Sequence, residues 1–133
     1  MIIATMGLPR SGKSTWCGKQ EYPVICPDDF RIATHGEAFN ATAEPVVWAS
    51  IWIAIRALLR RHETIIFDAA NTTRKRRDEL RRLSKARVYF RVFTAQTSVC
   101  IVRAGDNEQL VDVINRMADQ WEPLQDDEDV WKG

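Results

Sequence analysis

The chain has 133 residues and a formal net charge of +1, with 28% charged and 45% hydrophobic residues. This length favours one domain covering residues 1–133, and the composition is typical of a soluble globular protein. No apolar stretch reaches the length of a membrane span, and the N-terminus lacks the segments of a signal peptide, so we expect a cytoplasmic protein without a membrane partner. Three cysteines without Cys-x-x-Cys spacing indicate buried free thiols in a reducing compartment.

The first predicted strand is the apolar run Met1–Thr5, and a glycine-rich loop follows it. This loop, residues 7–15, reads GLPRSGKST and fills every fixed position of the phosphate-binding pattern G-x-x-x-x-G-K-[ST]. Glycines let such a loop curl so that its backbone N–H groups point at a phosphate, and a helix from Lys13 to about Lys19 adds its positive dipole end. We therefore expect the following residues to bind a nucleoside triphosphate: Gly7, Leu8, Pro9, Arg10, Ser11, Gly12, Lys13, Ser14 and Thr15.

Two side chains of this loop have separate expected roles. Lys13 can reach the β- and γ-phosphates of ATP or another nucleoside triphosphate, and the hydroxyl of Ser14 can ligate Mg²⁺. The alternative is an ordinary strand–turn–helix that holds these residue types by chance. The complete pattern directly after a strand favours nucleotide binding.

A short strand and two helices are predicted next. Val24–Cys26 is apolar, and in the following Pro27–Asp29 segment an aspartate offers the N-cap of a short helix over Phe30–Thr34. A long helix from Val46 to Arg61 then carries apolar residues at helical spacing. Its two tryptophans belong to this apolar repeat, so we expect them in the core rather than on a stacking platform.

A buried strand, Thr64–Asp68, precedes a basic helix that Thr72 or Thr73 can cap and that runs to about Lys85. Seven basic residues of this helix face only two acids, whereas the last fifteen residues of the chain are acid-rich. Arg74 and Arg77 are therefore candidates for contacts with the phosphate backbone of a nucleic acid. A solvated helix face with i,i+4 ion pairs is the competing interpretation.

The last predicted elements are a strand over Arg87–Thr94 and helices near Thr97–Arg103 and Gln109–Trp121. Short apolar strands that alternate with helices predict an α/β fold, with a parallel sheet of four or five strands and helices on both faces. In this sheet, the strands that begin near Ile2 and Ile65 are expected to be neighbours. Their carboxyl ends would then place Lys13 and Asp68, the acid that ends the strand near Ile65, at one rim of the sheet.

The polar residues expected at this rim suit phosphoryl transfer to a hydroxyl group. Such a reaction needs a base near the hydroxyl and positive charge around the transferred phosphoryl group. Asp28 or Asp29 offers the base, Arg31 and a lid arginine offer the charge, and Asp68 can hold Mg²⁺-bound water or orient the acceptor. The competing interpretations are a helix N-cap for Asp28 and a strand-end carboxylate for Asp68.

Four segments carry a family resemblance, in an order that spans nearly the whole chain. They are GLPRSGKSTW at Gly7–Trp16, CPDDFR at Cys26–Arg31, IIFDAAN at Ile65–Asn71 with Arg74–Arg77 behind it, and VDVINRMADQWEP at Val111–Pro123. With them the chain resembles the polynucleotide 5′-kinase family of P-loop phosphotransferases, which includes phage and bacterial RNA-repair kinases. The resemblance implies an ATP- and Mg²⁺-dependent kinase that acts on a hydroxyl of a nucleic acid, in particular a 5′-OH end.

On the acceptor side, the resemblance implies that Asp28 is the general base that takes the proton of the attacking hydroxyl. Arg31 would contact a phosphate of the acceptor, while Asp68 and Asn71 would shape the acceptor pocket and support Arg31. One departure affects this side: Ala70 stands where the family often has threonine.

On the donor side, the resemblance implies that Arg116 lies on a lid of roughly residues 103–120 and clamps the donor phosphates. Arg103 would be a second nucleotide contact. Arg10 departs from the family, which often has glycine there, and Ala104–Asp112 contains no arginine, so the lid is expected to be reduced. Relatives also commonly continue into another strand after the position of Gly133.

Other functions remain open at this stage. The acceptor could be a hydroxymethylated base of DNA, as in related phage kinases, or a small nucleoside or sugar. A non-catalytic nucleotide-binding module is the alternative from another class. The joint presence of Asp28, Arg31 and Arg116 argues against that module, because binding alone requires the loop but not a base.

Overall fold

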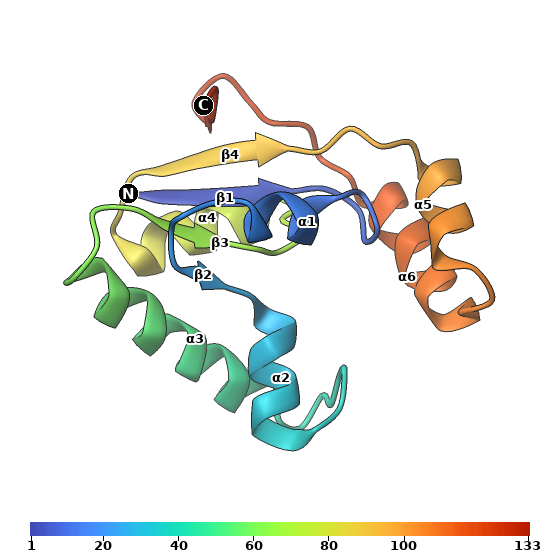
Figure 1. Ribbon diagram of the computed structural model, residues 1–133, viewed down its shortest axis with the longest axis horizontal. Helices are drawn as coiled ribbons and strands as arrows, with labels where there is room; N and C mark the ends of the chain where they lie inside the picture. Colours follow the sequence, from blue (N-terminus) through green and yellow to red (C-terminus); the bar gives the residue numbers. More distant parts are fainter.

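The computed structural model describes all residues from Met1 to Gly133 and contains a five-stranded parallel sheet (Figure 1). The strand order is β2-β3-β1-β4-β5, and the strands are β1 (Ile2–Met6), β2 (Val24–Ile25), β3 (Ile65–Phe67), β4 (Val88–Val92) and β5 (Asp129–Val130). β1 and β3 pair directly, with Ile2 opposite Ile65. The predicted parallel α/β sheet and the predicted adjacency of these two strands are confirmed.

Helices lie on both faces of the sheet. They are α1 (Lys13–Gly18), α2 (Pro27–His35), α3 (Glu44–Leu59), α4 (Arg74–Ser84), α5 (Thr97–Ala104) and α6 (Glu108–Asp119). The arrowheads of β1 and β4 in Figure 1 point toward α5 and α6, so this helix pair lies beyond the carboxyl ends of the central strands. None of the helices combines the length and the apolar character needed to cross a lipid bilayer.

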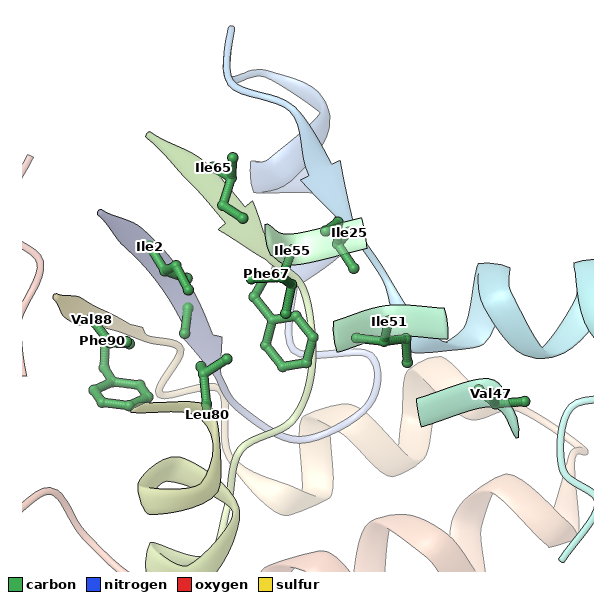
Figure 2. Close-up of a cluster of buried hydrophobic side chains, with 11 residues drawn as sticks. Ile2, Ile25, Val47, Ile51, Ile55, Ile65, Phe67, Leu80, Val88 and Phe90 are labelled. Atoms are coloured by element: carbon green, nitrogen blue, oxygen red, sulfur yellow. The ribbon is translucent and has the colours of Figure 1, made fainter. Parts of the chain in front are cut away.

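Alternate residues of the strands build two apolar layers, because successive strand side chains point to opposite faces. The larger cluster joins Ile2 of β1 and Phe67 of β3 to the inner faces of α3 and α4 (Figure 2). On the other face, Ile3 and Ile66 pack with Cys17 of α1. Since helices cover both faces of the central strands, β1 and β3 are buried along their whole length.

The two tryptophans of α3 pack against the larger cluster, as predicted. The ring centroids of Trp48 and Trp52 are 5.6 Å apart, and that of Trp48 is 6.4 Å from the Phe67 ring. Both tryptophans are only partly buried. Trp48 therefore has an anchored edge in the core and a part that remains exposed.

The start of α2 differs from the prediction. The helix begins at Pro27, so Cys26 is the N-cap residue, and Asp28 and Asp29 lie inside the first turn. Proline is favoured at the first helical position, and acidic residues in the first turn interact well with the helix dipole. The predicted capping role of an aspartate is therefore wrong, and the Asp28 side chain is 76% exposed. For α4, the predicted cap is confirmed, since Thr73 Oγ1 accepts from the N–H of Arg76.

A buried ion pair ties the C-terminal segment to α4. Arg77 and Glu128 are both fully buried as side chains, and Arg77 Nε lies 2.7 Å from Glu128 Oε2. Arg77 Nη1 also donates to the carbonyl of Asn71 at 3.0 Å. Nearby, Arg74 donates to Asp127 and Asp78 at 2.6–2.8 Å. The acidic end of the chain thus neutralises part of the basic helix.

Glu128→Ala is expected to lower the free energy of unfolding by about 3–5 kcal/mol, because it leaves the buried guanidinium of Arg77 without its partner. Urea unfolding followed by circular dichroism measures this loss. Asp127→Ala is the matched control, since it removes the neighbouring acid. Arg74, the partner of Asp127, is accessible to solvent and keeps its ion pair with Asp78 in this variant. A loss for Glu128→Ala no larger than that of the control would contradict a structural role for the buried pair.

Candidate active site

The phosphate-binding loop joins β1 to α1 and depends on two of its glycines. Gly12 has a φ of 102°, a left-handed conformation that side chains rarely adopt. At Gly7 a Cβ atom would lie 2.7 Å from Ser11 Oγ and 2.9 Å from Phe93 Cβ, so the close approach of these neighbours requires glycine. These two positions allow the loop to curl at the carboxyl end of β1.

Arg10 has a left-handed backbone, with a φ of 67°. This conformation explains physically why glycine suits the position, and this chain adopts it with an arginine. The carbonyl of Arg10 accepts a hydrogen bond from Arg103 Nη1 at 3.0 Å. The last turn of α5 thus contacts the loop backbone directly, while the predicted contact between Arg103 and the nucleotide remains a prediction.

The side chain of Lys13 folds back onto the backbone at the start of the loop. Its Nζ donates to the carbonyls of Gly7 at 3.0 Å and Leu8 at 2.6 Å. Burial lowers the pKa of Lys13, and the negative charge of Asp68 opposes that shift. A bound phosphate would favour the charged form of the ammonium group for the same electrostatic reason as Asp68 does.

Asp68 follows β3 and meets the loop at the same rim, as predicted. Ser14 Oγ donates to Asp68 Oδ2 at 3.0 Å, and Thr5 Oγ1 lies 3.3 Å from Asp68 Oδ1. This hydroxyl–carboxylate pair offers the hard oxygen ligands that Mg²⁺ prefers. The structure contains no group of three or more His, Cys, Asp or Glu side chains that could hold a metal ion by itself. The donor set fits an Mg²⁺ ion that is ligated mainly by nucleotide phosphates and water.

On α2, Arg31 is held between two acids. Its Nη2 and Nε donate to Glu44 at 2.8–3.2 Å, and its Nη1 donates to Asp28 Oδ1 at 2.9 Å. Hydrogen bonds from Arg31 lower the pKa of Glu44. Burial alone would lower the pKa of Arg31, but the bonds to both acids outweigh it and raise the pKa. Sequence patterns did not identify Glu44, because nothing marks an acid thirteen residues away as the partner of Arg31.

Asn71 has a mainly structural contact. It has a φ of 51°, and its Nδ2 donates to the carbonyl of Thr5 at 2.7 Å. The neighbouring carbonyl of Ala70 accepts from the N–H of Gly7 at 2.9 Å. Both bonds fasten the loop after β3 to the end of β1, so they fix the distance between the phosphate-binding loop and the wall that carries Asp68.

These elements enclose one cavity of about 630 Å³, a volume usual for small-ligand sites. Its walls come from the phosphate-binding loop, the start of α2, one residue of α3, the loop after β3, the start of α4, and α6. The predicted site residues that line it are Pro9, Arg10, Lys13, Ser14, Asp28, Arg31, Asp68, Asn71 and Arg116. Asp29 and Arg103 do not line it, whereas Trp48 and Arg76, which were not predicted as site residues, do.

The predicted acceptor contacts of Arg74 and Arg77 need correction. Arg77 is fully buried against Glu128, so its guanidinium cannot reach a nucleic acid backbone. Arg74 is bound by Asp78, Asp127 and Glu128, which leaves its charge compensated. Counting charges within the helix missed these partners because two of them lie more than fifty residues away in the sequence.

Comparisons with known proteins agree with this architecture. The family described as AAA domain matches residues 2–121. No curated protein gives a significant match. A chain of the Pnkp1/Rnl/Hen1 complex superposes with a TM-score of 0.69 at 23% identity, over 77% of this chain and 38% of that one. This chain therefore spans well under half of that relative's length.

Two bacterial sugar kinases share the same fold over most of their length. A sugar kinase from Janibacter sp. HTCC2649 superposes with a TM-score of 0.72 at 20% identity, over 98% of this chain and 82% of that one. A gluconokinase from Sinorhizobium meliloti 1021 gives a TM-score of 0.61 at 21% identity, over 96% and 79%. Together with the family match, these likenesses confirm the predicted P-loop fold.

Proposed function

Because the chain belongs to the AAA domain family, we propose that its P-loop binds ATP and that the protein transfers the γ-phosphoryl group to a nucleic-acid hydroxyl, a 5′-OH end. One observation carries this proposal: the exposed carboxylate of Asp28 and the ammonium group of Lys13 line the same cavity. A nucleotide-binding module would need the loop but would have no use for an exposed carboxylate across from it.

In this proposal, Asp28 accepts the proton of the attacking hydroxyl. Arg31 orients Asp28 through their hydrogen bond, and Glu44 holds Arg31 in place. Ser14 and Asp68 would hold Mg²⁺, which neutralises charge on the donor phosphates when it is bound. Water exclusion would come from α6, whose residues form one wall of the cavity.

Arg116→Ala is expected to lower kcat on the order of 10²-fold while raising the KM for ATP much less. A lid arginine gains most of its interaction as charge develops on the transferred phosphoryl oxygens, so its loss affects turnover first. Steady-state transfer assays with varied ATP measure both constants. Arg103→Ala, on the same side but outside the cavity, should have the smaller effect. An unchanged kcat for Arg116→Ala would make Arg116 a surface residue of α6.

Three features support a nucleic acid as the acceptor. The four sequence segments resemble those of polynucleotide 5′-kinases, and a chain of the Pnkp1/Rnl/Hen1 RNA repair complex has a similar fold. The cavity also presents Arg31 and Arg76 on the side of Asp28, where a negatively charged acceptor would lie. A small sugar or nucleoside is the second candidate, because the charges of Arg74 and Arg77 are compensated and sugar kinases share the fold.

A transfer assay with γ-labelled ATP distinguishes these acceptors. The panel contains DNA and RNA oligonucleotides with a 5′-OH, the same oligonucleotides with a 5′-phosphate, hydroxymethyluracil DNA, nucleosides and gluconate. We expect label only on the 5′-OH oligonucleotides. Label on a sugar or nucleoside alone would show that the proposed acceptor is wrong, while the proposed kinase activity would stand. No transfer to any compound would favour a nucleotide-binding module.

A further inference from the structure

Arg76 and Trp48 form a stacked pair on the cavity wall. The guanidinium carbon of Arg76 lies 4.7 Å from the centroid of the Trp48 ring, within the range of a cation–π interaction. Both residues line the cavity that also holds Asp28. Resting on the proposed nucleic-acid kinase activity, we infer that Arg76, held on Trp48, binds a phosphate of the acceptor strand.

Stacking leaves the hydrogen-bonding capacity of Arg76 free. A guanidinium group carries its N–H donors in its own plane, so contact through its face does not use them. The guanidinium of Arg76 makes no hydrogen bond within the chain, and its nearest acid, Glu79, is 4.0 Å away. With 52% of its side chain exposed, Arg76 can present two parallel donors to a phosphate.

Trp48 gives Arg76 a fixed support. Its ring packs against Trp52 and Phe67, so the indole cannot turn without disturbing the core. A long arginine side chain normally loses much conformational freedom when it binds a ligand. Because the stacking on Trp48 already restricts Arg76, less freedom remains to be lost when a phosphate binds.

The charges around Asp28 require a further cation. Asp28, Arg31 and Glu44 carry a combined formal charge of −1, and three of the five donors of Arg31 are directed at the two acids. A phosphate beside this group would be repelled unless another positive charge lay close by. Arg76 is near enough that its charge helps to lower the pKa of Glu44. Arg76 is therefore a cation placed to offset this negative group.

Arg76→Gln tests the assignment with a 5′-OH oligonucleotide as acceptor. We expect the KM for the oligonucleotide to rise about 10- to 100-fold, as for the loss of a charged hydrogen bond, with the KM for ATP unchanged. The slope of log binding constant against log salt should become shallower by about 0.7, the contribution of one single-strand phosphate. Arg76→Lys should recover part of the affinity, because lysine keeps the charge but not the paired donors.

Arg82→Gln is the matched control, since Arg82 is an exposed arginine of the same helix that does not line the cavity. We expect this control to leave the acceptor KM unchanged. An equal effect of both variants would overturn the assignment in favour of general charge, and so would an unchanged acceptor KM for Arg76→Gln. If the unaltered protein labels sugars or nucleosides but no oligonucleotide, the proposed acceptor fails, and the role of Arg76 fails with it.

Discussion

Asp28→Ala is expected to lower kcat by about 10²–10⁴-fold, the usual contribution of a positioned general base, and to leave ATP affinity nearly unchanged. The carboxylate lines the cavity from the first turn of α2, an element separate from the phosphate-binding loop. Single-turnover transfer from γ-labelled ATP gives the rate, and equilibrium titration with ATP gives the affinity.

Two further variants separate catalysis from structure at this position. Asp28→Asn keeps a hydrogen-bond acceptor for Arg31 but cannot take a proton at neutral pH, so we expect a loss of kcat similar to that of Asp28→Ala. Asp29→Ala removes the neighbouring acid of the same helical turn, which does not line the cavity, and should have little effect. If Asp29→Ala alone is damaging, the base is misassigned by one residue. If neither aspartate matters, the pair serves only the start of α2.

Local patterns predicted the phosphate-binding loop and the position of Asp68 beside it. The phosphate-binding loop is continuous in sequence, and the apolar runs on β1 and β3 predicted two buried neighbouring strands. Adjacent parallel strands bring their carboxyl ends together, so the proximity of Lys13, Ser14 and Asp68 followed from strand order. Each of these inferences needed only a short window of sequence and one rule of topology.

The surroundings of Arg31 and the charge balance of α4 depended on distant contacts. The partner of Arg77 is Glu128, fifty-one residues further on, and the partner of Arg31 is Glu44 on a different helix. No periodicity links such residues, so the basic helix looked uncompensated when its own acids were counted. β5 was also missed, because its two residues lie in an acid-rich segment that gives no strand pattern.

The same reasoning explains why the core packing of Trp48 was predicted but its place on the cavity wall was not. Helical spacing placed Trp48 in the core, and its ring does pack there. Spacing cannot show that a large ring also reaches past the core, because that depends on where the loop after β3 and the start of α4 lie. Residues with one buried and one exposed face are therefore where sequence patterns are least informative about a binding site.

Lys13→Ala is expected to abolish measurable transfer and to weaken ATP binding as well. The ammonium group neutralises the phosphates both in the bound ground state and in the transition state, so its loss should affect KM and kcat together. Lys19→Ala, an exposed lysine at the end of the same helix, is the matched control and should behave like the unaltered protein. Thermal unfolding of both variants shows whether the lost bonds to Gly7 and Leu8 disturb the fold.

The titration of Lys13 gives this prediction a second readout. Burial lowers its pKa, so the charged form is lost at a lower pH than in a free lysine, whose pKa is 10.5. ATP affinity should therefore begin to fall as the solution becomes alkaline, before the pH reaches that value, because the neutral amine no longer attracts the phosphates. Lys13→Ala should remove this fall while Lys19→Ala keeps it. If Lys13→Ala kept both the alkaline fall and normal ATP affinity, Lys13 would not hold the phosphates and the kinase proposal would lose its donor site.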